Sequence, residues 1–373
     1  MVNFTILAGG FAVPGFIATY NFDSDAGSLS LASTSTTGDS AVNEISPVGN
    51  LQSLSVAADG SVTVVDTVST GGNGPTFTNP LSTGEVSAMN FGSPNCSFVA
   101  TDPNDPLKFI ESPVLSFPVA EGAPSNPHMS LEHNGEIFVP DLGGDKIWRV
   151  VNDGEPGKFK VQGQIDIDAG AGPRHIAIHD DILFTIHEKT STLTAQRIPE
   201  APNGTAFPLL ANVSVIPPNP LNGTKFAAAE ILISTPTEKF PNPLIYVSNR
   251  NIGETIDENG DTIAIFEFQN GTTSTGGSGA GAGTCANKRR RHARDFKKRE
   301  GEALTLLAQV PTGLQQIRSM ALGRVDDGGD EFLIAGANTV GGVAIFQRVD
   351  GGRNLTLVAR NEEIANRTSF VFI

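Results

Sequence analysis

The chain has 373 residues, and its 40 Asp and Glu against 25 Lys and Arg give a formal net charge of −15. A surface this acidic repels nucleic acids and anionic membranes, so neither is expected as a partner, and an anionic substrate would need locally placed arginines. Two cysteines, Cys96 and Cys285, are too few for a disulfide framework.

Signals of cellular location point in two directions. The first residues lack a basic segment before an apolar stretch, so no signal peptide is predicted and the cytoplasm is slightly favoured. No apolar run has the length of a membrane span. Secretion stays open because of eight N-x-[ST] sequons, at Asn3, Asn95, Asn203, Asn212, Asn222, Asn270, Asn354 and Asn366.

Short strands separated by turns are the predicted elements along the whole chain. Near the N-terminus, residues 4–8 are predicted to form a strand that enters a Gly-Gly turn, and further strands are predicted at 51–56 and 86–91. The 41 Gly and 24 Pro separate such runs throughout, and no stretch of a dozen residues combines helical periodicity with caps. This pattern indicates an all-β sandwich, barrel or propeller.

An internal repeat distinguishes among these folds. Residues 126–131, 137–142 and 146–150 are similar to 172–177, 183–188 and 193–196, with an offset of 46 residues. Parts of the same unit recur at 244–250 with 263–268, and at 317–322 with 332–338 and 343–346. Each unit is a strand, a turn, a more apolar strand, a short loop and another strand, which is typical of a four-stranded propeller blade.

The repeat predicts that residues 1–373 form a single domain, a β-propeller with four-stranded antiparallel blades, and a seven-bladed β-propeller fits the length. Seven units give about 53 residues each; six or eight blades also fit this arithmetic, and a β-sandwich with fortuitous similarity is the alternative fold. The N- and C-terminal segments are expected to close the ring, because closure removes the last open edge. We expect a strand within 3–8 or 16–22 to share a sheet with one from 344–347 or 355–359.

Residues 269–302 are predicted to be an insertion within the propeller. A Gly, Ser, Thr and Ala tract at 271–283 precedes 288–299, which holds eight Lys and Arg and one Asp. The segment is too poor in apolar residues to pack, so we expect it to be disordered. Its basic run is either a solvated loop or a nuclear address, a processing site or an anion-binding arm.

Residues 126–150, the turn Gly172-Pro173-Arg174-His175 and the later Ser248-Asn249-Arg250-Asn251 resemble one propeller family. This family comprises seven-bladed lactonases typified by bacterial 6-phosphogluconolactonase, together with the fungal 3-carboxy-cis,cis-muconate cyclase. The resemblance extends from about residue 120 to residue 347. The family's Asn-Pro-Ser-Trp type opening of an early blade is missing, and Gly49-Asn50-Leu51-Gln52 stands in its place.

The resemblance implies a site, because His128, Arg174, Glu188 and Arg250 match positions implicated in the cyclase. The repeat gives an independent reason for their clustering, since equivalent positions in a ring of blades lie on one circle. His128, Arg174 and Arg318 occupy one register, and Glu188 and Arg250 a second. The candidate catalytic residues are His128, Glu188 and Arg174, and the candidate substrate-binding residues are Arg250, Arg318 and Asn249.

These residue types fit the chemistry of a carboxylic ester. Arginines without adjacent acidic residues suit a carboxylate, a phosphate or the oxyanion of a lactone. His128 can act as base or acid near neutrality, and Glu188 either moves a second proton or holds an arginine or the imidazole. As neighbours on a strand, His175, His187 and Asp141 are expected to face away. Structural hydrogen bonds are the alternative role for each site residue.

Three functions remain open. The first is a hydrolase of a small anionic lactone, derived from a sugar acid or phosphosugar, in which His128 activates water. The second is a cycloisomerase that forms a lactone from a carboxy-muconate-type diene acid. The third is a non-catalytic binding module, which would need exposed aromatic anchors, yet only Trp148, Tyr20 and Tyr246 supplement the phenylalanines. No metal-ligand spacing and no G-x-S-x-G motif occurs, so neither a cofactor nor a covalent mechanism is expected.

Overall fold

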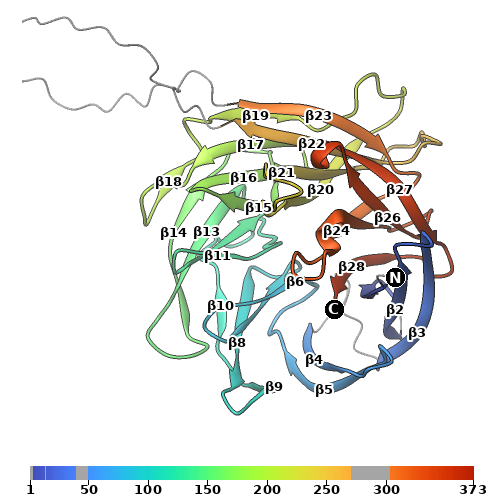
Figure 1. The fold of residues 1–373 in the computed structure, drawn as a ribbon. Coiled ribbons are helices and arrows are strands. Elements are labelled where there is room, and N and C mark those ends of the chain that lie inside the picture. The colour runs from blue at the N-terminus through green and yellow to red at the C-terminus, as the bar shows by residue number, and fades with distance from the viewer. Residues whose placement is uncertain (1–2, 13, 39–48, 270–302) are drawn as a thin grey trace, which may run out of the picture.

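Short β-strands arranged around a central axis make up the regular structure (Figure 1). The computed structural model describes residues 3–12, 14–38, 49–269 and 303–373. Within these ranges the helices are two 3-10 turns, η1 (Gly329–Glu331) and η2 (Asp350–Gly352). Neither is long and apolar enough to cross a membrane.

Six sheets of four or five strands follow one another around the axis. The first contains β28 (Arg367–Phe372), β1 (Asn3–Gly10), β2 (Gly15–Asp23) and β3 (Ser28–Gly38). The next contains β10 (Val114–Ser116), β8 (Asn95–Asp102), β7 (Val86–Asn90) and β6 (Pro75–Pro80), with β9 (Asp105–Ile110) also paired to β8. The third contains β11 (Leu131–His133), β12 (Glu136–Asp141), β13 (Lys146–Asn152), β14 (Phe159–Asp166) and the parallel β18 (Gly204–Thr205).

The remaining three sheets have four strands each and complete the repeat found in the sequence. One contains β15 (Pro173–His179), β16 (Ile182–His187), β17 (Thr192–Arg197) and β19 (Ala211–Ser214). The next contains β20 (Phe226–Ile233), β21 (Leu244–Asn251), β22 (Thr262–Gln269) and β23 (Ala303–Pro311). The last contains β24 (Ile317–Leu322), β25 (Phe332–Ala337), β26 (Val343–Val349) and β27 (Asn354–Asn361). The predicted four-stranded antiparallel blade is therefore confirmed.

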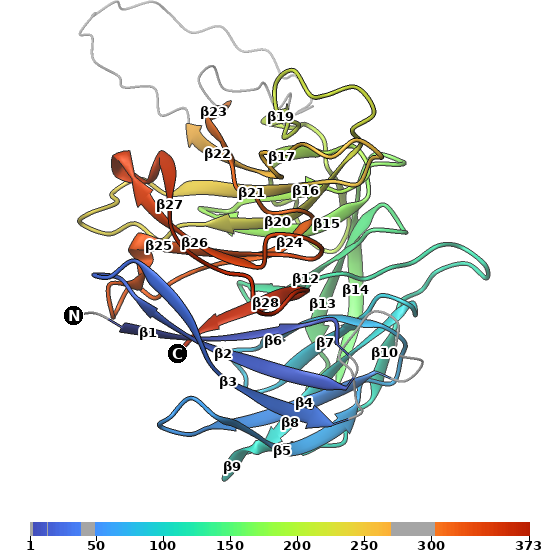
Figure 2. The same cartoon turned by 90° about the vertical axis from the view of Figure 1, so that its right-hand side faces the viewer.

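A two-stranded sheet, β4 (Asn50–Val56) and β5 (Val62–Ser69), holds the seventh place in the ring. It lies between the blades that contain β3 and β9 (Figures 1 and 2). On one side the amide of Val62 donates to Ser35 Oγ at 2.9 Å, and on the other Ser53 Oγ donates to the carbonyl of Leu107 at 2.6 Å. The described part of the molecule thus has six full blades and one reduced blade.

The chain ends close the ring as predicted, but through a different C-terminal strand. β1 pairs with β2 on one side and with β28 on the other, so both termini belong to one sheet and lie side by side (Figures 1 and 2). The expected partners, residues 344–347 and 355–359, lie in β26 and β27 of the preceding blade. The strand β28 follows them in the chain and provides the pairing with β1 that was expected of them.

Apolar side chains pack between neighbouring blades, so each blade covers the face of the next. The second strand of a blade is buried on both faces, which explains why it is the most apolar part of the repeat: every residue of β16 and β25 is buried. Outer strands such as β3 alternate between buried and exposed residues. The insertion is predicted at residues 269–302. Gln269 is the last residue of β22, and residues 270–302 lie outside the described residues.

Candidate active site

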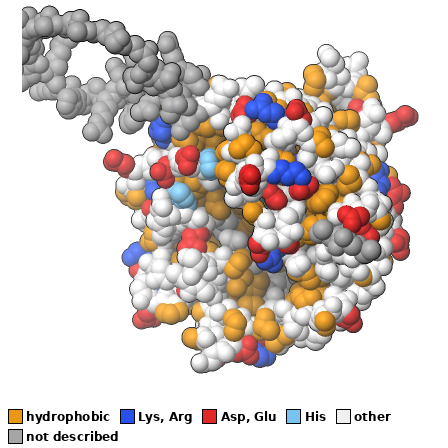
Figure 3. All heavy atoms as spheres, viewed as in Figure 1, with side chains coloured by type: hydrophobic (Ala, Val, Ile, Leu, Met, Phe, Trp, Pro, Cys, Tyr) orange, Lys and Arg blue, Asp and Glu red, His pale blue; other side chains and the backbone are white. Residues whose placement is uncertain are grey.

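A cavity of about 320 Å³ lies inside the ring. Its lining comes from the first strands of several blades and from β1, β2 and β4, and it includes His128, Arg174, His175, Glu230 and Arg318. In the space-filling view, apolar side chains lie around a hollow near the middle of this face, while acidic side chains are scattered across the face (Figure 3). The cavity therefore collects the polar residues that the repeat predicts on one circle.

A β-bulge near the start of four inner strands aims side chains into the ring. In β15 the register shifts between Pro173 and His175, which leaves Arg174 without a partner residue in the ladder. The same shift falls at Arg318 in β24, at Thr76 in β6 and around Glu230 in β20. At Arg174 and Arg318 the shared register that the sequence predicts is thus a bulge position, a feature that commonly re-aims side chains beside functional sites.

His128 is 2% exposed and lines the cavity. Its backbone amide donates to the carbonyl of Pro140 at 3.0 Å, which fixes it beside β12, and its ring contacts the edge of Phe91. Its Nδ1 lies 3.1 Å from Nε2 of His175. With Nδ1 engaged, Nε2 is the ring nitrogen of His128 that is available to a ligand.

The prediction that His175 faces away from His128 is wrong, and the bulge is the reason. It shifts the alternation of β15 by one residue, so Arg174 and His175 both line the cavity. His175 Nδ1 lies 2.6 Å from Oε1 of Glu230, which sequence reasoning missed. Glu230 and His175 thus form a hydrogen-bonded chain that ends on His128.

These hydrogen bonds between Glu230, His175 and His128 determine which imidazole nitrogens carry protons. The Glu230 carboxylate accepts, so a neutral His175 donates from Nδ1 and accepts at Nε2. His128 must then donate from Nδ1, which leaves a lone pair on its Nε2. Burial and the Arg174 guanidinium hold the pKa of His128 well below 6.5, and burial also lowers the pKa of His175 despite the opposing Glu230. Both rings are therefore neutral at neutral pH.

Glu188 joins the two arginines of the predicted site. Its Oε2 lies 2.9 Å from Nε of Arg174 and 2.7 Å from Nη2 of Arg250. Burial alone would raise the pKa of Glu188, but the Arg250, Arg174 and Arg318 guanidiniums hold it below its usual value. Glu188 is therefore an ionised partner of the arginines, which agrees with the second of the two roles expected for it, holding an arginine.

Arg174 is the member of this ion-paired group that lines the cavity, whereas Glu188 and Arg250 reach it only through Arg174. Arg174 Nη1 donates to the carbonyl of Ala229, and Arg250 Nε donates to that of Ala227 at 3.1 Å. Burial and the nearby Arg250 lower the pKa of Arg174 to about 9, so the group remains a cation at neutral pH.

Arg318 and Asn249 have different surroundings. Arg318 lines the cavity, with its guanidinium carbon 5.3 Å from the ring centre of Phe11. Asn249 precedes Arg250 on β21 and faces the other way, so its Nδ2 donates to the carbonyl of Val215 at 3.2 Å. Asn249 therefore supports the fold outside the cavity.

The other two neighbours, Asp141 and His187, face away from the cavity as expected. Asp141 accepts hydrogen bonds from the indole of Trp148 and the hydroxyl of Ser125. His187 Nε2 lies 2.9 Å from Thr194 Oγ1.

In the site itself, three guanidiniums and two carboxylates leave one net positive charge while the histidines are neutral, so the cavity favours an anion.

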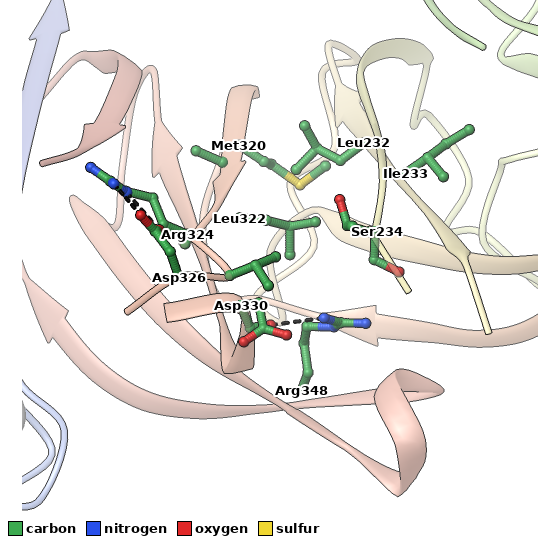
Figure 4. Close-up of a pocket in the computed structure, with 13 residues that line it drawn as sticks. Leu232, Ile233, Ser234, Met320, Leu322, Arg324, Asp326, Asp330 and Arg348 are labelled. Carbon is green, nitrogen blue, oxygen red and sulfur yellow. Dashed lines mark hydrogen bonds and ion pairs between the residues drawn. The ribbon is translucent and has the colours of Figure 1, made fainter. Parts of the chain in front are cut away.

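A larger, open cavity of about 660 Å³ lies between β20 and β24, at their ends remote from His128 (Figure 4). Its arginines already have protein partners: Arg324 pairs with Asp326, and Arg348 donates to the carbonyl of Asp330 and to Tyr246. Met320, Leu322 and Leu232 supply apolar lining. No histidine is among its lining residues, so we place the chemistry in the smaller cavity.

Comparisons with known proteins identify the family of the chain. Residues 14–278 match the family model described as "Lactonase, 7-bladed beta-propeller". A 6-phosphogluconolactonase from Yersinia pestis (strain Pestoides F) is 26% identical over 230 residues. That alignment covers 59% of this chain and spans 64% of the relative's length. A 6-phosphogluconolactonase from Serratia proteamaculans is 30% identical over 143 residues, which are 36% of this chain and 40% of that protein.

Solved structures match the fold over the full chain. A periplasmic gluconolactonase from Pseudomonas aeruginosa has a TM-score of 0.73 at 14% identity and covers 100% of this chain and 99% of its own. A putative 6-phosphogluconolactonase from Bacteroides fragilis has a TM-score of 0.72 at 16% identity, with 100% and 98% covered. At these identities the likeness concerns the propeller alone.

Proposed function

Because the chain belongs to the lactonase family of seven-bladed β-propellers, we propose that it hydrolyses a small anionic lactone in the cavity inside the ring. One observation carries the proposal: the hydrogen-bonded Glu230–His175–His128 series, from which we infer an unprotonated Nε2 on His128, lines the same cavity as Arg174 and Arg318. A base next to positive charge is what water attack on a carbonyl requires.

His128 acts as the general base. As the water oxygen bonds to the lactone carbonyl carbon, one water proton moves to His128 Nε2 and the carbonyl oxygen gains negative charge. The ring carbon–oxygen bond then breaks, and the leaving alkoxide takes the proton back from Nε2. The product is a hydroxy acid, which releases one proton to solvent on ionising. The low pKa of His128 keeps the base unprotonated over the neutral range.

The arginines bind the anion and stabilise the oxyanion. Arg174 and Arg318 line the cavity, so their guanidiniums reach a bound carboxylate or the developing oxyanion. Glu188 positions Arg174 and Arg250 through two ion pairs rather than moving a proton, since its pKa is held low. This leaves His128 as the group that transfers protons.

The reaction is tested with purified protein and a panel of sugar lactones, phosphosugar lactones and carboxy-substituted muconates. Ring opening is followed by proton release at constant pH, and muconate cyclisation by ultraviolet absorbance. We expect one proton released per lactone consumed and no muconate cyclisation. Cyclisation without lactone hydrolysis would replace the hydrolase with a cycloisomerase, and inactivity on both classes would contradict an enzyme of either kind.

A further inference from the structure

We infer that the lactone bound here carries one carboxylate and a hydrocarbon substituent, rather than a phosphate and several hydroxyls. This inference rests on the proposed lactonase function and deepens it. It comes from the part of the cavity lining that the catalytic groups do not occupy. Six apolar side chains reach the cavity from the β1–β2 segment, β4 and β6: Phe11, Phe16, Ile17, Leu51, Leu54 and Phe77.

These side chains would contact the substrate directly. Phe77 lies edge-on to His175, with ring centres 5.6 Å apart, and Phe11 lies under the Arg318 guanidinium at 5.3 Å. The apolar lining therefore begins next to the catalytic groups. A substituent on the lactone ring would leave water for an apolar surface, which favours hydrocarbon over hydroxyl groups.

Two of the polar side chains on the same strands, Gln52 and Thr76, already donate hydrogen bonds within the protein. Gln52 Nε2 donates to the carbonyl of Thr37 at 3.1 Å and to Thr67 Oγ1 at 3.4 Å. Thr76 Oγ1 donates to the carbonyls of Met89 and His128, both at 3.4 Å. Sugar hydroxyls placed here would lose water without gaining these donors, which is costly.

The charge of the site matches one carboxylate. Three guanidiniums against two carboxylates leave a single positive charge, whereas a phosphate monoester carries about −1.5 to −2 at pH 7. Arg174 uses Nε for Glu188 and Nη1 for the carbonyl of Ala229, so Nη2 is the nitrogen it offers to a ligand. Such a site suits a monoanion better than a phosphate.

The test compares two lactones with the full-length protein at constant pH. Phenylparaconate is a γ-lactone with one carboxylate and one phenyl ring, and 6-phosphoglucono-δ-lactone is the phosphosugar counterpart. Each kcat/KM is divided by that lactone's spontaneous hydrolysis rate. We expect this ratio to be at least about tenfold larger for phenylparaconate than for 6-phosphoglucono-δ-lactone. A small difference in apolar contact changes the kcat/KM of one substrate relative to another by roughly 10- to 200-fold.

Variants locate the effect in the apolar lining. Leu54→Gln should raise KM for phenylparaconate about tenfold, and Leu54→Met should leave it unchanged. Leu357→Gln, at a leucine 47% exposed on β27, is the matched control and should have no effect. Ile17→Thr provides a second cavity variant if thermal melting shows that Leu54→Gln does not fold.

The outcomes distinguish a failure of the inferred substrate class from a failure of the proposed lactonase function. If the phosphosugar lactone is preferred and both cavity variants leave KM unchanged, the inference is overturned and the lactonase remains. If neither lactone is opened, the lactonase fails, and calorimetric titration with 4-phenylbutyrate and 6-phosphogluconate then tests the ligand class alone. Tighter binding of 4-phenylbutyrate, lost in Leu54→Gln, supports the inference, and tighter binding of 6-phosphogluconate contradicts it.

Discussion

The protonated nitrogen of His128 is determined by Glu230, a residue that the sequence repeat does not align with His128. Glu230 is 8% exposed and lies on the next blade but one, yet its hydrogen bond to His175 sets the tautomer of both histidines. The arrangement resembles the way a carboxylate orients a catalytic imidazole, with one further ring in between. Residue chemistry here depends on contacts across blades.

Glu230→Gln tests this arrangement. The amide keeps the shape of the side chain but can also present a donor to His175 Nδ1, which permits the wrong tautomer. We expect kcat to fall about 10- to 100-fold with little change in KM. Nitrogen NMR of the His128 ring should show loss of the Nδ1–H tautomer. Glu85→Gln, at another buried carboxylate that accepts from the amide of Gly157, should leave kcat unchanged.

The pH dependence follows from the depressed pKa of His128. The base is unprotonated above that pKa, so kcat/KM should be level through the neutral range and fall only at a pH well below 6.5. Arg318 is one of the charges that lower this pKa. Arg318→Gln should therefore move the acid limb to higher pH, whatever it does to the plateau. An acid limb that stays in place or moves to lower pH would contradict the electrostatic argument.

Most of the candidate site follows from the sequence, and the part that does not has two causes. His128, Arg174 and Arg318 share a register in the repeat, and Glu188 and Arg250 are joined to Arg174 by ion pairs. His175 was expected to face away because simple alternation along a strand turns neighbours to opposite faces, and a one-residue bulge reverses that conclusion. Glu230 was missed because its strand, β20, was not recognised as part of the repeat.

At the scale of elements, closure depends on a tight approach between β25 and β28. A Cβ added at Gly336 on β25 would overlap the carbonyl of Arg367 and the ring of Phe370. Gly9 lies on β1, which pairs with β28, and it has room: an added Cβ would lie 3.7 Å from Ser369 and 3.8 Å from Ile17. The two glycines form a matched pair.

Gly336→Ala should lower the free energy of unfolding by about 1–3 kcal/mol, because backbone and ring must shift to accept the methyl group. Gly9→Ala should leave it unchanged or raise it by up to about 1 kcal/mol, since alanine restricts the unfolded chain. Urea unfolding of both variants measures the difference. Equal free energies of unfolding for the two variants would mean that β28 shifts easily to accept the methyl group and contributes little to ring closure.

Element boundaries were harder to predict than element types. The closing strand was expected at 344–347 or 355–359, although Arg367–Phe372 has alternating apolar residues at its end and forms β28. Blade-forming segments before residue 120 also resemble the repeat weakly. Their reduced member, β4 with β5, has two strands instead of four, so no full copy exists to align.

The whole molecule is a ring in which each blade contacts its neighbours, and the repeat alone indicated this architecture. Gln269 at the end of β22 pairs with Ala303 at the start of β23, so the two residues that flank residues 270–302 are neighbours in one sheet. A short connection can therefore replace them without moving either strand.

Replacing residues 271–298 with a short Gly-Ser linker should change the free energy of unfolding by only about 1 kcal/mol, since loop-closure entropy varies slowly with length. The lactone kcat/KM should also stay the same, as the cavity residues described here lie outside that segment. Denaturant unfolding checks the first expectation and proton release the second. A loss of several kcal/mol would show that the segment packs on the propeller.

The central claim, that His128 is the base of a lactonase site inside the ring, is tested most directly by kcat/KM for lactone hydrolysis in His128→Gln. His133→Gln is the matched control, because His133 pairs with Asp181 at the surface. We predict a loss of at least about 100-fold for His128→Gln, with an unchanged melting temperature, and no loss for His133→Gln. Full activity in folded His128→Gln would contradict the account.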